Sequence, residues 1–245
     1  MSATVTLAVA GRVLTQVRRD RRTVAMLLVV PCLLISLLWW MFEDLPGEQF
    51  DRFGPGLLAM FPFIVMFLVT SVTTLRERSS GTLERLLTMP MGRLDFLLGY
   101  ALAFGLLAAV QSVLAVAVSV GLLGLEVEGS VWLLGVVAVV DAVLGTALGL
   151  LVSAFATTEF QAVQFMPAFV LPQVLLCGLF VPRTSMPGVL EAISSVLPLS
   201  YAVDAMQELV GSAGSAEVWR DVAVVLAFAL AALALGAATL RRRTP

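Results

Sequence analysis

Long apolar runs separated by short polar segments are the dominant pattern along this chain. Six runs are long enough to cross a bilayer as helices, and they comprise residues 24–42, 55–75, 94–123, 131–156, 160–181 and 222–240. The first run contains 19 residues without a charge, and a helix of that length measures about 28 Å, close to the thickness of the hydrocarbon core. The pattern predicts an all-α integral membrane protein with six transmembrane helices in a single domain, residues 1–245.

The N-terminal segment, residues 3–22, predicts a further helix outside these runs. Leu7, Leu14 and Val17 share one side of this helix, while Arg12 and other polar residues lie elsewhere around it. Such a helix is expected to lie in the membrane interface, where its arginines meet anionic headgroups. A disordered basic tail is the alternative interpretation.

The segment between the fifth and sixth runs, residues 182–211, contains two short amphipathic patterns separated by Pro198 and ended by Gly211. The apolar positions in each pattern share a helical face. Because continuous apolar stripes are unfavourable in water, we expect a helical hairpin that re-enters the outer leaflet. The alternative is a folded external loop resting on the membrane surface.

Residues 76–93, RERSSGTLERLLTMPMGR, form the longest charged stretch between two apolar runs. A short helix is predicted after Gly81, with Thr82 as its cap and Pro90 ending it. Leucines fall on one face and charges on the other: Leu83, Leu86 and Leu87 against Glu84 and Arg85. A two-faced helix at this place suits a membrane protein driven by a separate soluble motor, whereas an ordinary solvated loop is the alternative.

Composition and charge agree with a membrane protein and suggest its orientation. Hydrophobic residues make up 60% of the chain and charged residues 13%, and the mean hydropathy is +1.00. Of the 15 basic residues, five lie in residues 12–22, four in 76–93 and three in 241–243. The positive-inside rule therefore places both termini and residues 76–93 on the cytoplasmic side of a bacterial membrane. The first run lacks a small-residue cleavage site and is expected to remain in the mature chain.

Missing residue types exclude several kinds of chemistry. The chain contains no Lys and no His. Without Lys it has no GxxxxGK[ST] phosphate loop, so any ATP is expected to be bound by a partner. Without His the usual general base and metal ligand are absent. Cys32 and Cys177 lie in separate apolar runs, where a thiol behaves as a small hydrophobe. We therefore expect no catalytic residue, metal site or cofactor in this chain.

Polar residues inside the runs are the candidates for a translocation path. Asp141 is the only ionisable residue well inside a predicted span, and no basic residue lies at comparable depth. A structural or cavity-lining role is expected, with proton coupling as the alternative. Gln111 and Gln164 either bond between helices or line a route for an amphipathic solute whose walls include Phe165 and Phe169.

Gly145 and Gly149 lie on the same predicted helix as Asp141, in GxxxG spacing. This spacing permits close approach of another helix, although it predicts dimerisation only weakly.

Taken together, these features resemble the membrane subunits of type-2 ABC exporters, and most closely the drug-resistance permeases of the daunorubicin-export type. The resemblance covers nearly the whole chain. Its most specific part is an acidic and basic pair followed by GTLE, a leucine pair and a proline: Glu77, Arg78, Gly81, Thr82, Leu83, Glu84, Leu86, Leu87 and Pro90. A second match is Pro198, Leu199, Ser200 and Tyr201, in the external hairpin that also contains Pro187.

The resemblance implies a machine of several subunits. Residues 81–87, including Arg85, would form the coupling helix that seats in a separate ATPase, which would bind ATP and Mg and be present in two copies. A homodimer, or a heterodimer with a similar permease, would form through the first and fifth spans, with Ser36, Trp39, Phe165 and Phe169 as candidate contacts. The family often has an Arg a few residues beyond the Tyr, where this chain has Gln207.

The sequence thus predicts an exporter permease for an amphipathic drug or natural product. The same machine exporting a lipid, a lipid-linked glycan or a peptide is the nearest alternative. A proton-coupled carrier that uses Asp141, and a membrane scaffold or sensor without transport, are more distant alternatives.

Overall fold

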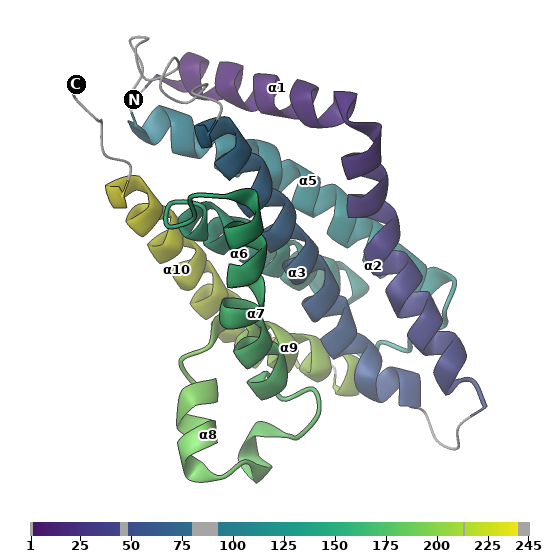
Figure 1. The fold of residues 1–245 in the computed structure, drawn as a ribbon. Helices are drawn as coiled ribbons and strands as arrows, with labels where there is room; N and C mark the ends of the chain where they lie inside the picture. Colours follow the sequence, from purple (N-terminus) through teal and green to yellow (C-terminus); the bar gives the residue numbers. More distant parts are fainter. Residues whose placement is uncertain (1, 45–48, 80–92, 213, 240–245) are drawn as a thin grey trace.

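A computed structural model describes residues 2–44, 49–79, 93–212 and 214–239 of the 245-residue chain, without the side chains of Arg78, Arg93 and Leu94. Within these ranges all regular secondary structure is helical (Figure 1). Five of the described helices are long and apolar enough to cross a membrane: α2 (Arg21–Phe42), α3 (Gln49–Ser79), α5 (Arg93–Gly121), α6 (Val131–Val152) and α10 (Ala216–Thr239). The prediction of an all-helical, multi-pass membrane protein is therefore confirmed.

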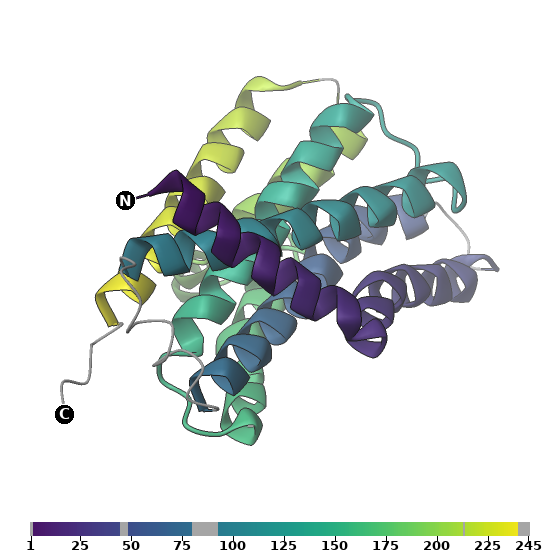
Figure 2. The same cartoon turned by 90° about the horizontal axis from the view of Figure 1, so that it is seen from above.

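Helix α1 (Ala3–Arg19) forms where the sequence predicted an amphipathic helix, and it lies across α5 when seen from above (Figure 2). Its buried residues are Thr6, Val9, Ala10, Val13 and Val17. Leu7 is 65% exposed on the surface of this chain, where the predicted interfacial position would bring it against lipid. The buried side of α1 faces α5, where a Cβ on Gly99 would lie only 2.6 Å from a methyl of Val9.

The connection from α1 to α2 is a one-residue break at Asp20. The Asp20 side chain accepts hydrogen bonds from the Thr23 backbone N–H at 3.2 Å and from the Thr23 hydroxyl at 2.7 Å. It therefore caps α2. The hydroxyl bond in particular lowers the pKa of Asp20 below its ordinary value of 3.8.

Helix α7 (Glu159–Leu176) corresponds to the fifth predicted span, residues 160–181, but differs from it. It is not among the five apolar helices, because a glutamate, three glutamines and two prolines reduce its hydropathy. Its 18 residues end at Leu176, since the chain turns at Gly178 with a φ of +94°. Glycine tolerates this left-handed conformation.

Contacts between helix ends define two ends of the bundle. At the end that carries α1, the last turns of α6 and α10 meet, with Leu151 within 3.9 Å of a Cβ position on Gly236. At the opposite end, the Gly129 N–H that precedes α6 donates to the carbonyl of Leu209 at 2.8 Å. Since α7 follows α6 and precedes α10, it runs back along the bundle between these ends. The start of α1 and the end of α10 both lie at the end that carries α1 (Figure 1).

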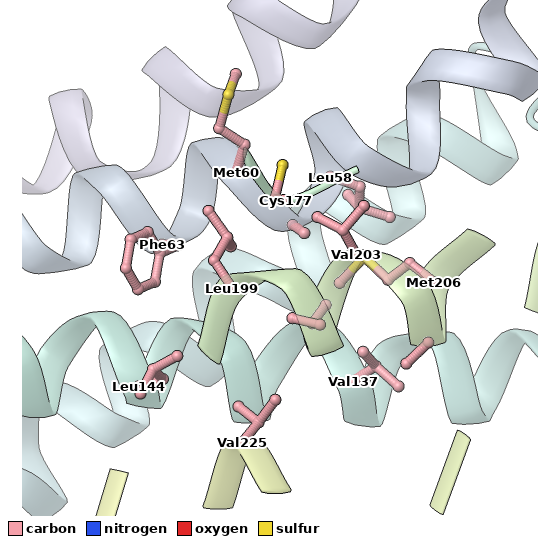
Figure 3. Close-up of a cluster of buried hydrophobic side chains, with 14 of the residues drawn as sticks. Leu58, Met60, Phe63, Val137, Leu144, Cys177, Leu199, Val203, Met206 and Val225 are labelled. Atoms are coloured by element: carbon pink, nitrogen blue, oxygen red, sulfur yellow. The ribbon is translucent and has the colours of Figure 1, made fainter. Parts of the chain in front are cut away.

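The predicted hairpin contains η1 (Arg183–Ser185), α8 (Gly188–Ser194) and α9 (Pro198–Gly211). Helices α8 and α9 are bent by 90° at the break before Pro198. Helix α9 packs against α3, α6 and α10, and its residues join a buried apolar cluster with the central parts of these helices (Figure 3). That cluster includes Leu58, Phe63, Val137, Leu144, Leu199, Val203, Met206 and Val225.

Candidate functional site

The predicted coupling segment comes between α3 and α5 in the chain, and the end of α3 and the start of α5 both contact α1. Its central residues, Gly81, Thr82, Leu83, Glu84, Arg85, Leu86 and Leu87, fall outside the described residues, so their helix remains a prediction. Glu77 and Arg78 belong to the last turn of α3. Glu77 is buried and forms an ion pair with Arg12 of α1 at 3.3 Å.

The first turn of α5, on the other side of the coupling segment, is also tied to α1. The Asp95 carboxylate accepts a hydrogen bond from the Ser2 backbone N–H at 2.9 Å and one from the Thr6 hydroxyl at 3.4 Å. Arg76, one turn before the end of α3, pairs with Glu159 at the start of α7 at 3.0 Å. Both helices that lead into the coupling segment are therefore fixed to neighbouring helices by charged side chains.

The external-hairpin residues lie at the opposite end of the bundle. Pro187 precedes the first residue of α8 and Pro198 is the first residue of α9. Pro is favoured at such positions because its fixed φ suits a helix start. Leu199 and Ser200 are buried, whereas Tyr201 is half-buried and its hydroxyl donates to the Ser195 carbonyl at 2.6 Å. The structure thus places Pro198, Leu199, Ser200 and Tyr201 at the junction of α8 and α9, whereas Pro187 lies at the other end of α8.

An ion pair that sequence reasoning missed joins the two arms of this hairpin. The Arg183 guanidinium bonds to the Asp204 carboxylate of α9 and lies 5.1 Å from the centroid of the Tyr201 ring. The arginine beside Tyr201 therefore comes from η1. Gln207, at the position where the family often has an Arg, lines a cavity instead. The signals were an isolated Arg and an isolated Asp 21 residues apart, and periodicity does not show that two such residues meet.

The cavity that Gln207 lines has a volume of about 270 Å³. It separates the first turns of α3, at Asp51, Arg52 and Pro55, from the hairpin at Pro182 and Val210. Asp51 also accepts the backbone N–H of Glu126 at 3.1 Å. The cavity combines both signs of charge with apolar walls at the hairpin end.

The candidate path residues fall into two separate groups. Gln111 and Asp141 are fully buried among the helices of this chain. Gln164 and Phe169 are exposed on α7, and Phe165 is half-buried beside Phe169 with ring centroids 6.1 Å apart. The structure therefore brings the aromatic pair together on the surface of α7 and does not place it with the buried pair. Within the described ranges, no group of three His, Cys, Asp or Glu residues is arranged to hold a metal ion.

Comparison with known proteins agrees with this arrangement. The family model described as ABC-2 type transporter matches residues 4–210. The chain is 29% identical over 190 residues to the probable multidrug ABC transporter permease YbhS of Escherichia coli, which covers 77% of this chain and 50% of that protein. It is 28% identical over 176 residues to the inner membrane transport permease YhhJ of Escherichia coli, covering 70% and 47%.

A eukaryotic relative is ABC transporter G family member 20 of Dictyostelium discoideum, 26% identical over 187 residues, with 75% of this chain and 26% of that protein covered. The chain spans about half the length of the bacterial relatives that it matches. The family match extends from α1 to α9 and covers well over half of the sequence. The chain therefore belongs to the ABC-2 type transporter family.

Proposed function

We propose that this chain is the permease subunit of an ATP-driven ABC exporter in a bacterial cytoplasmic membrane. A separate ATPase, present in two copies, supplies the energy and binds ATP and Mg. The chain itself holds no cofactor and is not an enzyme. The re-entrant hairpin faces outward, and both termini lie in the cytoplasm.

The observation that carries this proposal is the anchoring of both flanks of residues 80–92. Glu77 pairs with Arg12 on one flank, and Asp95 holds the N-terminus of α1 on the other. A push on the segment between them is transmitted to α3, α5 and α1 together because charged contacts connect these helices. The arginines in and around this segment favour a cytoplasmic position, where a soluble ATPase can reach it.

A second permease copy, identical or similar, completes the proposed transporter. Exposed apolar side chains cover much of α2 and α7, including Leu33, Trp40, Phe160 and Leu175. Lipid or another copy can cover such faces. Ser36, Trp39, Phe165 and Phe169 remain the proposed contacts, and the Phe165 and Phe169 rings are already paired on α7.

The proposed substrate is an amphipathic drug or natural product that moves out of the cell. Support comes from the names of the Escherichia coli relatives YbhS and YbhR, each a probable multidrug ABC transporter permease. A lipid, a lipid-linked glycan or a peptide is the alternative cargo for the same machine.

Charge reversal in the coupling segment tests the ATPase partnership. Glu84→Arg is expected to reduce co-purification of the ATPase at least about tenfold, because a like charge at a protein interface costs several kcal/mol. Glu217→Arg is the matched control, since it makes the same change on an exposed residue at the start of α10. Pull-down from membranes with equal permease content measures both. Unchanged ATPase recovery with Glu84→Arg contradicts the proposal.

A further inference from the structure

We propose that Asp141 is a positioning residue that carries a proton and links α6 to α3 by donating a hydrogen bond to the backbone carbonyl of Leu58. The inference rests on the proposed function only for its transport readout. Its other observations concern the packing of one chain.

The Asp141 carboxyl group is buried halfway along α6 and is 0% exposed. Within the part of the chain that the structure describes, no donor bonds to either of its oxygens. An ionised carboxylate can only accept hydrogen bonds, and leaving it buried without a donor or a cation is strongly unfavourable. A neutral carboxyl group carries an O–H donor. It therefore needs a nearby hydrogen-bond acceptor, whereas the ionised group needs a donor.

A proton is the cation that fits this position. The described residues contain no group of three acidic, Cys or His side chains that could bind a metal ion. Asp141 also has no ion-pair partner among the described residues. A bound proton neutralises the carboxyl group without further ligands, and leaves it only an O–H donor to satisfy.

The register between α6 and α3 identifies the segment opposite Asp141. Gly145 and Gly149 follow Asp141 at intervals of four residues, so all three lie on one face of α6. A Cβ on Gly145 would lie 2.5 Å from the Phe63 carbonyl oxygen, and one on Gly149 would lie 2.6 Å from that of Phe67. Both helices advance by four residues between these contacts, so they run in the same direction. One turn earlier, Asp141 therefore faces α3 near residues 58 and 59.

That part of α3 contains a backbone acceptor that lacks its usual donor. Pro62 lies inside α3 and has no N–H, so it cannot donate to the Leu58 carbonyl four residues earlier. Freed carbonyls in membrane helices need a new partner, and side chains from neighbouring helices can supply one. A neutral Asp141 has an O–H donor that needs an acceptor, and the Leu58 carbonyl is an acceptor without its usual donor. A hydrogen bond between them therefore satisfies both groups.

Titratable groups on the surrounding elements do not supply a counter-charge in the central turns. The Cys177 thiol, after α7, is buried and donates to the Val174 carbonyl at 3.2 Å, and Asp204 is paired with Arg183. The remaining charged or titratable residues of the four helices that pack against α6 are Asp51, Arg52, Arg76, Glu77 and Arg78 of α3; Arg93, Asp95 and Tyr100 of α5; Tyr201 and Glu208 of α9; and Glu217, Arg220 and Asp221 of α10.

Infrared spectroscopy of the purified permease tests the protonation state without an ATPase. The wild-type spectrum near neutral pH is expected to contain the C=O stretching band of a protonated carboxylic acid, and Asp141→Asn should remove it. If subtracting the two spectra shows only the loss of a carboxylate band, Asp141 is ionised and the proposal is wrong.

A double-mutant cycle tests the hydrogen bond to α3. Asp141→Leu should lower the melting temperature by roughly 3–10 °C through loss of a buried hydrogen bond. Asp141→Asn can still donate a hydrogen bond, so this variant should keep most of the wild-type stability. Pro62→Ala restores an N–H donor to Leu58, so Asp141→Leu should cost much less stability in that background.

Gln111→Leu is the matched control for this cycle, because Gln111 is also fully buried and without a hydrogen-bond partner among the described residues. Its effect should be the same with and without the Pro62→Ala substitution. Equal losses for Asp141→Leu in both backgrounds would rule out the link to Leu58. In transport assays, Asp141→Asn should remain active. An inactive but stably folded Asp141→Asn would point to a proton-carrier role for the residue instead.

Discussion

At the scale of single residues, two glycines decide how closely α6 approaches α3. Any side chain at Gly145 or Gly149 would meet the α3 backbone at less than 3 Å. A flexible side chain could move aside, but a backbone carbonyl moves only with its helix. Because lipid tails are as apolar as leucine side chains, such close packing is a main source of stability between membrane helices.

Gly145→Ala is therefore expected to destabilise the protein by about 1–3 kcal/mol through overpacking, which corresponds to a melting temperature roughly 3–10 °C lower. Gly135→Ala on the same helix is the control, since no atom lies within 4 Å of a Cβ at that position. Alanine also favours the helix at Gly135, so this variant should melt at or above the wild-type temperature. Thermal unfolding in detergent measures both, and equal effects would contradict the packing argument.

At the scale of elements, the hairpin is held by one ion pair and by the burial of α9. The side chains of Arg183 and Asp204 are 19% and 34% exposed. The attraction between the two charges is stronger at this depth than in a surface ion pair, because less water competes for each charge. Helix α8, by contrast, leaves Val189 and Ile193 exposed, which is compatible with contact with lipid.

Arg183→Ala should loosen the hairpin by about 1–2 kcal/mol, since the Asp204 charge remains without its partner. Hydrogen exchange of the backbone amides in residues 183–211 should then be faster, with little change in α5. Arg76→Ala is the matched control. It removes a pair with Glu159 at 3.0 Å in which both side chains are exposed, at 61% and 48%, so it should change exchange in the hairpin very little. Comparable acceleration by both variants would argue against the role of Arg183.

At the scale of the whole molecule, α7 determines how many times the chain crosses the membrane. It is more polar than the five helices that are apolar enough to cross a membrane. It nevertheless runs between the two ends of the bundle, because Glu159 is bonded to α3 at one end and the hairpin follows at the other. A helix of 18 residues is about 27 Å long, so it is long enough to reach across the hydrocarbon core.

Cysteine labelling tests this crossing and the proposed orientation together. In a chain with Cys32 and Cys177 replaced by Ala, Thr157→Cys and Thr184→Cys place exposed thiols on either side of α7. An impermeant maleimide should label the Thr184→Cys variant in intact cells and the Thr157→Cys variant only in inside-out vesicles. Labelling of both variants from the same side would show that α7 does not cross.

The sequence by itself determined the protein class, the positions of the apolar helices and the family resemblance. These depend on local properties: hydropathy over about 20 residues identifies a span, and the residues that match the family are consecutive in the chain. It also indicated that Gly145 and Gly149 permit close packing, without showing that their partner is α3 of the same chain.

Only the tertiary structure decided which faces of the helices meet. The sequence does not show whether an apolar residue contacts lipid or another helix. The docking of α1 through Val9 rather than Leu7 therefore could not be predicted. For the same reason, the sequence grouped Asp141 with Phe169, although one is fully buried and the other is 51% exposed. The pairing of Arg183 with Asp204 required the chain to bend by 90° between α8 and α9, and pairings across such a bend depend on the packing of the whole bundle.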